Sequence, residues 1–304
     1  MKHLFIASLL LLSVGCAKQS DAPETTEAPP VETETPAQEP AADSGDRLAD
    51  ILATQPDEAK ARYEFRNPQA TLEFIGIEPG MTVVEALPGG GWYTKVLLPY
   101  LGSDGHLIGV DYASDMWKEF SFYSDELGEA KKTWKADWTT EANGWRSDDS
   151  ASVSAQIFGG VPESETATAD AVLMIRALHN LARFETKGGY LSQALSDAHR
   201  MLKPGGVLGI VQHEAPDSKA DEWADGSRGY LKKSAVIDAV TNAGFEYVGS
   251  STINENPKDQ PGDEDIVWRL APSFATSREN EELKAELTPI GESNRMTLKF
   301  VKPE

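Results

Sequence analysis

Cysteine is nearly absent from this chain of 304 residues, because Cys16 is the only one. A single cysteine cannot form an internal disulfide. The few histidines lack the i, i+4 helical spacing and the cysteine partners that mark a zinc site. We therefore expect neither a disulfide framework nor a metal centre, and leave open only a convergence of His179 and His213 at adjacent strand ends.

Positive charge is also scarce. The chain carries 28 Lys and Arg residues against 49 Asp and Glu residues, a formal net charge of −21. Nucleic acid binding depends on Lys and Arg that neutralise phosphates, so that class of function is disfavoured. Direct adhesion to an anionic lipid surface is disfavoured for the same reason. We predict no nucleic acid partner.

Two enzyme signatures are missing as well. The chain contains no Gly-x-Ser-x-Gly segment and no Walker loop. The first of these places a hydrolase serine on a sharp turn, and the second wraps backbone amides around a phosphate chain. Serine hydrolases of that type and P-loop nucleotidases are therefore excluded.

The N-terminal residues have the pattern of an export signal. A short basic start is followed by an apolar run from Leu4 to Leu12. That run is shorter than the roughly 20 residues that a membrane-spanning helix needs. Its length is typical of the core of a signal peptide. We predict a signal peptide over residues 1–15 and an exported protein.

The end of that signal, Leu12-Ser13-Val14-Gly15-Cys16, resembles a bacterial lipobox, with Ser13 where leucine is usual. The resemblance implies a lipid anchor on Cys16, and stable anchoring needs more than one acyl chain. Because Ala17 is not the aspartate associated with inner-membrane retention, we expect an outer-membrane site facing the periplasm. The alternative is an ordinary cleaved signal peptide, with Cys16 there by chance.

Residues 16–46 are rich in Pro, Glu, Thr and Ala and contain no aromatic residue. Such a stretch cannot bury enough apolar surface to offset its chain entropy. We predict a disordered acidic linker there, followed by one domain over residues 47–304, which is long enough for a single large core.

Strand and helix patterns alternate along that domain. Alternation of this kind indicates an α/β fold, with a mostly parallel sheet of about seven strands and helices on both faces. We expect residues 254–265 to form a loop and residues 266–270 to form a short edge element or a turn of helix. The expected strands are 81–87, 106–110, 152–158, 169–175, 207–212, 245–252 and 296–301, and the expected helices are 47–65, 69–76, 91–101, 113–132, 189–202 and 232–243.

The strand over 81–87 runs into glycines and then directly into a helix. Glycines let a ligand lie against the backbone, and a helix start offers unpaired N–H groups. The segment Glu85-Ala-Leu-Pro-Gly-Gly-Gly91 resembles motif I of class I methyltransferases, in which an acid is followed by glycines at the second, fourth and sixth positions. Here Leu87 replaces the first glycine, whereas Gly89 and Gly91 match. The alternative is a simple tight turn between a strand and a helix.

The longer string Pro-Gly-Gly-Gly-Trp-Tyr-Thr is similar to a family of uncharacterised predicted methyltransferases, many of them exported. The resemblance implies a Rossmann-like methyltransferase fold and S-adenosylmethionine as the cofactor. It implies cofactor contacts from Glu85, Gly89, Gly90 and Gly91.

A second strand, over 106–110, also ends in an acid, Asp111. A carboxylate there can accept hydrogen bonds from both hydroxyls of a ribose. We therefore predict that Asp111 binds the cofactor, and an N-cap on the following helix is a compatible second role.

The strand over 169–175 is followed by Arg176, His179 and Asn180. In the methyltransferases that the chain resembles, this fourth strand points at the transferred methyl group. The resemblance therefore implies that these three residues are candidates for catalysis or substrate contact. His179 could act as a general base, and Asn180 could hold a substrate through its donor and acceptor groups. The alternative is that His179 and Asn180 stabilise a loop.

Three further features complete the resemblance. Leu202-Lys-Pro-Gly-Gly-Val-Leu208 resembles the turn before the fifth strand of many methyltransferases, where its role is structural. His213, at the end of that fifth strand, is a secondary site candidate. Asp137 resembles an acid that binds the adenine amino group elsewhere in the superfamily, but a surface role suits it better.

These expectations favour an S-adenosylmethionine-dependent methyltransferase that is exported and lipid-anchored, with an unknown small-molecule or cell-envelope acceptor. The cofactor is made in the cytoplasm, however, and export would separate the chain from it. A non-enzymatic periplasmic binding lipoprotein with a methyltransferase-like fold is the alternative. A third hypothesis is another reaction at the same cleft, using His179.

Overall fold

The computed structural model describes residues 42–304, with side chains from Arg47 onward. The predicted signal peptide, Cys16 and residues 16–41 of the predicted linker lie outside the described residues. Within the part that is described, no helix combines the length and the apolar character needed to cross a membrane.

Seven strands form one sheet in the order β3-β2-β1-β4-β5-β7-β6. Every pair from β3 to β5 is parallel, and β7 is antiparallel to both of its neighbours. The prediction of an α/β, Rossmann-like fold with about seven mostly parallel strands is confirmed. The strands are β1 (Thr82–Ala86), β2 (His106–Asp111), β3 (Ser152–Ile157), β4 (Ala169–Ile175), β5 (Leu202–His213), β6 (Glu246–Ser251) and β7 (Arg295–Val301).

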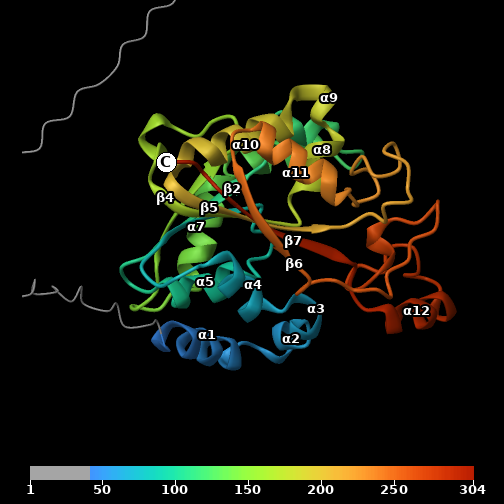
Figure 1. Cartoon of the computed structure of the whole chain (residues 1–304), viewed down its shortest axis with the longest axis horizontal. Helices are drawn as coiled ribbons and strands as arrows, with labels where there is room; N and C mark the ends of the chain where they lie inside the picture. Colours follow the sequence, from blue (N-terminus) through green and yellow to red (C-terminus); the bar gives the residue numbers. More distant parts are fainter. Residues whose placement is uncertain (1–41) are drawn as a thin grey trace, which may run out of the picture. The chain divides into compact units, whose positions relative to one another are not determined.

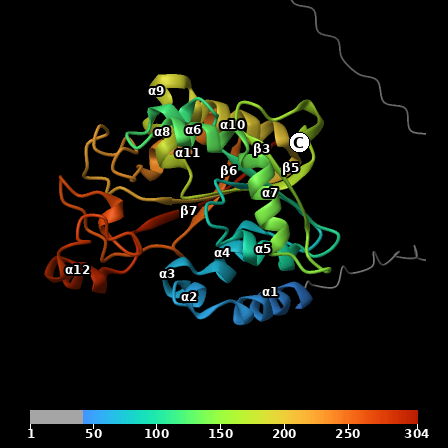
Figure 2. The ribbon, with the colours of Figure 1, turned by 180° about the vertical axis from the view of Figure 1, so that it is seen from behind.

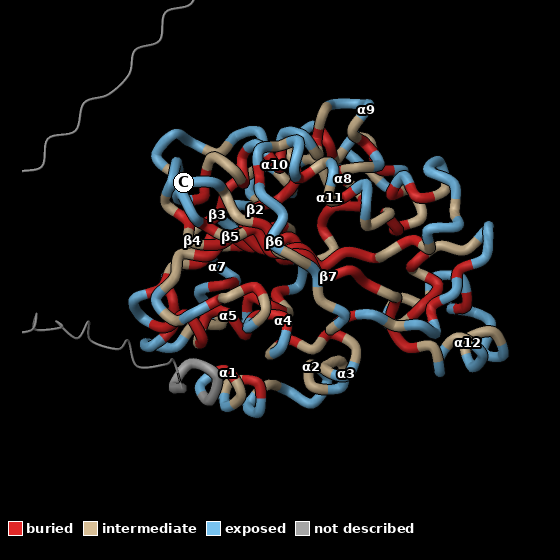
Figure 3. Tube along the Cα trace, in the orientation of Figure 1, coloured by how far each residue is buried: buried red, intermediate tan, exposed pale blue. Residues whose placement is uncertain are grey.

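Helices cover both faces of the sheet, as Figures 1 and 2 show. Alternate residues of a strand point to opposite faces, so Val83 and Leu107 pack against one helical layer while Val84 and Ile108 pack against the other. The first layer holds α1 (Ala42–Thr54), α4 (Pro68–Ile75), α5 (Thr94–Leu101) and α7 (Trp134–Gly144), and the second holds α8 (Leu178–Arg183), α10 (Tyr190–Met201) and α11 (Lys233–Asn242). The central strands between the layers are buried, whereas the edge strand β6 is largely exposed (Figure 3).

The N-terminal helices differ from the expected single helix over 47–65. The structure has α1, α2 (Asp57–Lys60) and α3 (Tyr63–Arg66) instead, and α1 begins five residues before the predicted domain start. Pro56 separates α1 from α2, because proline disfavours a helical residue before it and supplies no N–H. Its own backbone, with a ψ of 150°, is not helical. Asn67, in the left-handed conformation, separates α3 from α4.

The expected helix over 113–132 is also interrupted. It consists of a 3-10 turn, η1 (Met116–Glu119), and of α6 (Asp125–Lys132), whose first turn is capped by the side chain of Ser124. Six elements were not expected: α7 and α8 of the two helical layers, and the short α9 (Glu185–Gly188), η2 (Glu163–Glu165), α12 (Glu281–Leu287) and η4 (Thr288–Ile290).

A long segment, residues 252–294, connects β6 to β7 and carries α12 beside the sheet (Figure 1). Its predicted loop over 254–265 contains no regular element, and the edge element after it is a 3-10 turn, η3 (Val267–Arg269). The segment is held by buried Asp259, which accepts hydrogen bonds from the Tyr230 hydroxyl at 3.0 Å and from the Arg269 guanidinium at 2.8 Å. It therefore forms a fixed cover next to the ends of β5 and β7.

Candidate active site at the carboxyl ends of the strands

The bend after β1 has the backbone shape that a glycine-rich turn requires. Leu87, Gly89 and Gly91 all have positive φ values, of 54°, 56° and 76°. Leu87 stands where motif I has its first glycine, and it adopts the left-handed conformation that a glycine adopts at little cost. The missing glycine has therefore not changed the turn.

Space around the turn is uneven. A side-chain carbon added to Gly90 would meet no atom within 4 Å, and one added to Gly89 would only reach the Leu87 carbonyl at 4.0 Å. One added to Gly91 would lie 2.3 Å from the indole of Trp145. The outer side of the turn is thus open at Gly89 and Gly90, whereas Trp145 fills it at Gly91.

Glu85 lies just before this bend and is buried. Its carboxyl group accepts a hydrogen bond from the Thr94 hydroxyl at 2.6 Å. Burial raises the pKa of Glu85 to about 8, despite the hydrogen bonds from Thr94 that lower it. Without a bound cation, Glu85 is therefore mostly protonated at neutral pH, and a bound ammonium group would favour its charged form.

Asp111 ends β2 beside the same bend. Ala86 pairs with Val110, and the Leu87 amide donates to the Val110 carbonyl at 2.7 Å, so the turn and Asp111 follow neighbouring strands on one rim. The predicted N-cap role is wrong, because Asp115 precedes the next helical turn, η1.

The Asp111 carboxylate is paired with the Lys131 ammonium at 2.8 Å, and that ammonium lies 3.7 Å from the ring centre of Trp117. Burial raises the pKa of Asp111, against the lowering effect of Lys131. A ribose would have to share this carboxylate with Lys131 or displace it.

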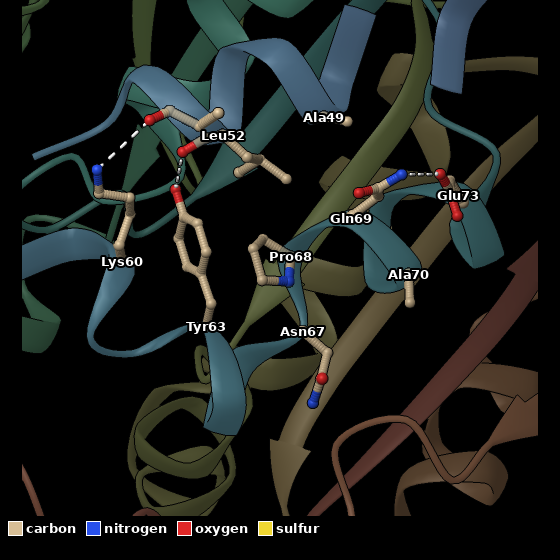
Figure 4. Close-up of a pocket in the computed structure, with 10 residues that line it drawn as sticks. Ala49, Leu52, Lys60, Tyr63, Asn67, Pro68, Gln69, Ala70 and Glu73 are labelled. Carbon is tan, nitrogen blue, oxygen red and sulfur yellow. Dashed lines mark hydrogen bonds between the residues drawn. The ribbon is translucent and has the colours of Figure 1, made fainter. Parts of the chain in front are cut away.

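Five of the hollows in the surface of the described chain are lined by residues other than Gly89–Gly91 and Asp111. The one in Figure 4, of about 540 Å³, lies among the N-terminal helices and is lined by Leu52, Tyr63 and Pro68. Another, of about 340 Å³, lies beside Glu214 after β5. The predicted cofactor residues therefore share a rim that Lys131 closes at Asp111.

His179 and Asn180 lie in the first turn of α8, and the His179 ring lies 5.7 Å from that of Trp268 in the segment 252–294. The Asn180 amide donates to the Tyr112 hydroxyl at 3.0 Å. Because β1 lies between β2 and β4, this bond spans the carboxyl end of β1. Asn180 thus borders the rim, with its side-chain N–H already engaged.

The predicted meeting of His179 and His213 is present, with ring centres 5.5 Å apart. Burial lowers the pKa of His179 to about 4, and burial with the neighbouring His179 and arginines lowers that of His213 well below its ordinary value. Both rings are neutral at pH 7, and His179 is a weaker base than an exposed histidine. In the described residues no group of three or more His, Cys, Asp or Glu side chains has the arrangement of a metal site.

Asp137 lies on α7, exposed to solvent, and accepts a hydrogen bond from the Thr133 hydroxyl at 2.7 Å. This contact belongs to the first turn of a helix and not to a strand end. The surface role that the sequence favoured for Asp137 agrees with this position.

An arginine cluster beside the rim was not predicted. Arg62 just before α3, Arg66 at its end and Arg295 of β7 all donate to the carboxylate of Glu292. Arg176, after β4, lies near enough to Arg66 and Arg295 to be repelled by them. The one sign of it in the sequence is a charged residue, Arg295, at the start of a strand that is mostly apolar.

No family model matches the chain, and no curated protein matches it either. Among solved structures it is similar to the [4+2]-cyclase SpnF, at 17% identity over 78% of this chain and 80% of that one, with a TM-score of 0.47. It is also similar to a putative methyltransferase from Bacillus halodurans C-125, at 16% identity over 79% of this chain and 100% of that one (TM-score 0.44). A SAM-dependent methyltransferase from Aquifex aeolicus matches at 17% identity over 68% of this chain and 93% of that one (TM-score 0.42). These identities bear on the fold alone.

Proposed function

We propose that the chain is an S-adenosylmethionine-dependent methyltransferase. The observation that carries the proposal is the placement of Glu85, the turn at Gly89–Gly91 and Asp111 on the adjoining ends of β1 and β2. In open α/β sheets, ligands bind at the carboxyl ends of strands near the switch in strand order, and here β1 and β4 flank that switch.

In this proposal Glu85 accepts the cofactor's ammonium group, the open backbone of Gly89 and Gly90 lies against the ligand, and Asp111 accepts from the ribose hydroxyls. The bound cofactor supplies a sulfonium-activated methyl group. The chain's own contribution is then mainly positioning, because an aligned acceptor can take the methyl without further activation. The pKa of His179, about 4, makes it a poor candidate for a base at neutral pH.

Titration calorimetry of the purified full-length chain with S-adenosylhomocysteine tests the proposal, with Gly90→Ala as the diagnostic variant. The added methyl meets no protein atom, so stability should be unchanged while the ligand, lying against Gly90, loses affinity. Gly249→Ala is the matched control, since a carbon added to Gly249 also meets no atom within 4 Å and β6 is the edge strand of the sheet, away from the turn. Absence of heat at millimolar ligand, or an equal effect of both variants, would refute the assignment.

A non-enzymatic binding protein with the same fold is the second candidate function. The pairing of Lys131 with Asp111 and the packing of Trp145 on Gly91 favour it, because both occupy the rim that the cofactor needs. Mass spectrometry of any small molecule that copurifies with the chain separates the two candidates. A nucleoside supports the enzyme, and a ligand without one supports the binding protein.

The proposal extends to location. The signal sequence and Cys16 support export and lipid attachment, with an acceptor that is a small molecule or a component of the cell envelope. Methyl transfer there requires cofactor outside the cytoplasm, so the enzyme proposal includes an external supply of it.

A further inference from the structure

The arginine cluster has more positive charge than it needs for its own ion pairs. Glu292 is 3% exposed and is the one carboxylate that the guanidinium groups of Arg62, Arg66 and Arg295 share. Burial raises the pKa of Glu292, but the three arginines outweigh burial and lower it overall. Glu292 is therefore charged and fully engaged.

Arg176 adds a fourth guanidinium group to this cluster. Among the described residues, no side chain or carbonyl forms a hydrogen bond or ion pair with its guanidinium. Burial, followed by repulsion from Arg66 and Arg295, lowers its pKa to about 9. Its backbone has a φ of 59°, an uncommon conformation for a residue with a side chain, and its amide is held by the Val211 carbonyl at 2.6 Å.

An excess of three positive charges around one carboxylate is costly in a buried place, where each ion needs a partner. The cost is notable in a chain whose net charge is −21, because carboxylates are plentiful in its sequence. A neighbouring donor is also unsatisfied. The indole N–H of Trp92 is buried without an acceptor, and the Arg66 guanidinium lies 4.6 Å from the centre of the Trp92 ring.

The cluster adjoins the candidate site on the side away from Asp111. Trp92 directly follows the glycine turn, Arg176 follows β4, and Arg295 pairs with His213 of β5. Asp111, the proposed ribose ligand, lies on β2, on the other side of β1. A group bound by Arg176 would thus sit across β1 from the ribose.

We propose that Arg176 and the Trp92 indole N–H, supported by Arg66 and Arg295, form an oxyanion subsite that receives a carboxylate or phosphate of the methyl acceptor. The assignment to the acceptor rests on the proposed methyltransferase function. The carboxylate of the cofactor's methionine part is the other source of the same chemistry, so the test has two arms.

The first arm measures thermal unfolding of the full-length chain in inorganic phosphate and in chloride at equal ionic strength. Phosphate should raise the midpoint of the wild-type chain and of Arg278→Gln, a control in which an exposed arginine loses the same charge. Arg176→Gln should lose most of that rise. In chloride it should be at least as stable as the wild type, because it removes a half-buried positive charge that Arg66 and Arg295 repel. No rise in the wild type, equal rises in all three chains, or a clear loss of stability in chloride would overturn the subsite.

Trp92→Phe keeps an aromatic ring beside Arg66 but removes the N–H donor together with the five-membered ring that carries it. It should fold like the wild type and show a smaller phosphate effect. Should Arg176→Gln fail to fold, this variant decides the question, and an unchanged phosphate effect in it would overturn the subsite.

The second arm compares S-adenosylhomocysteine with 5′-methylthioadenosine, which lacks the amino-acid part. If the subsite serves the acceptor, Arg176→Gln changes neither affinity. A loss of about tenfold or more for S-adenosylhomocysteine alone, as expected for a lost charge-assisted hydrogen bond, would assign the anion to the cofactor and overturn the acceptor assignment. If neither nucleoside binds while phosphate still requires Arg176, the proposed function fails and the subsite stands.

Discussion

At the scale of single residues, Glu85 gives a stability prediction with a definite sign. Its pKa in the folded chain is about 8 against an ordinary value of 4.5, so the folded chain keeps a proton that the unfolded chain releases between those values. Stability from this group is therefore fully present below about pH 4.5 and is lost as the pH rises towards 8. Glu85→Gln has no such proton and can still accept from Thr94. We expect the free energy of unfolding of Glu85→Gln to rise relative to that of the wild type as the pH rises, by a few kcal/mol at pH 8.

Urea unfolding of both chains across that pH range measures the effect. Glu78→Gln is the control, because Glu78 carries the same group on the exposed surface. A difference between Glu85→Gln and the wild type that does not change with pH would show that Glu85 is not held protonated.

A second prediction for a single residue concerns Gly91, where two independent effects oppose a side chain. Its φ is 76°, and a side-chain carbon would lie 2.3 Å from Trp145. We expect Gly91→Ala to lose about 1–3 kcal/mol in urea unfolding, through backbone strain and overpacking. Gly90→Ala, with neither obstacle, should lose no more than a few tenths of a kcal/mol.

A double-variant cycle separates the two effects at Gly91. In a Trp145→Ala background only the strain of the positive φ remains, so Gly91→Ala should cost less there than in the wild type. Equal costs in the two backgrounds would mean that Trp145 does not restrict this glycine.

At the scale of elements, Glu292 joins α3 to the start of β7 through its three arginines. Glu292→Gln leaves those guanidinium groups without a counter-charge, and we expect a loss of about 3–5 kcal/mol in urea unfolding. Phosphate should restore part of that loss, because it replaces the missing anion. Glu281→Gln on α12, which removes an exposed carboxylate, should have little effect in either buffer. A small loss for Glu292→Gln would show that the cluster does not hold α3 in place.

The sequence predicted most strand ends within one or two residues, because the central strands are apolar runs bounded by turn residues. β5 is the exception, since it begins at Leu202, five residues before the predicted start, and includes the predicted turn. The N-terminal helices were less predictable. Their apolar spacing continues across Pro56, and the breaking effect of that proline outweighed the spacing. α12 was missed because its exposed residues, mostly charged, carry no apolar stripe.

The candidate site also has parts that the sequence predicts and parts that it does not. Glu85, the turn and Asp111 were predictable because each directly follows a recognisable strand, and parallel strands end on one rim. The arginine cluster was not, because Arg66, Arg176 and Glu292 are far apart in sequence and meet only through the fold. Lys131 was equally invisible, since its pairing with Asp111 depends on where α6 ends.

At the scale of the whole molecule, the parallel core and its additions have separate roles. The core strands β1 and β2 position the residues that would hold a nucleoside, as in other doubly wound sheets. The residues around α3 and the segment 252–294 contribute Arg62, Arg66 and Glu292, whose charges act on Arg176. Specificity for an acceptor would therefore be set by these additions, while the cofactor contacts would be set by the core.

The proposed attachment to a membrane concerns the whole molecule, and a Cys16→Ser variant tests it. We expect the chain expressed in its bacterial host to incorporate labelled palmitate and to sediment with the outer membrane, because two or more acyl chains anchor a protein stably. Cys16→Ser removes the thiol that would carry them, so the variant should be unlabelled and leave the outer-membrane fraction. An ordinary cleaved signal peptide makes a different prediction, in which neither chain is labelled and both are released with the periplasmic contents. Labelling of the wild type that persists in Cys16→Ser would place the lipid on another residue and refute the assignment.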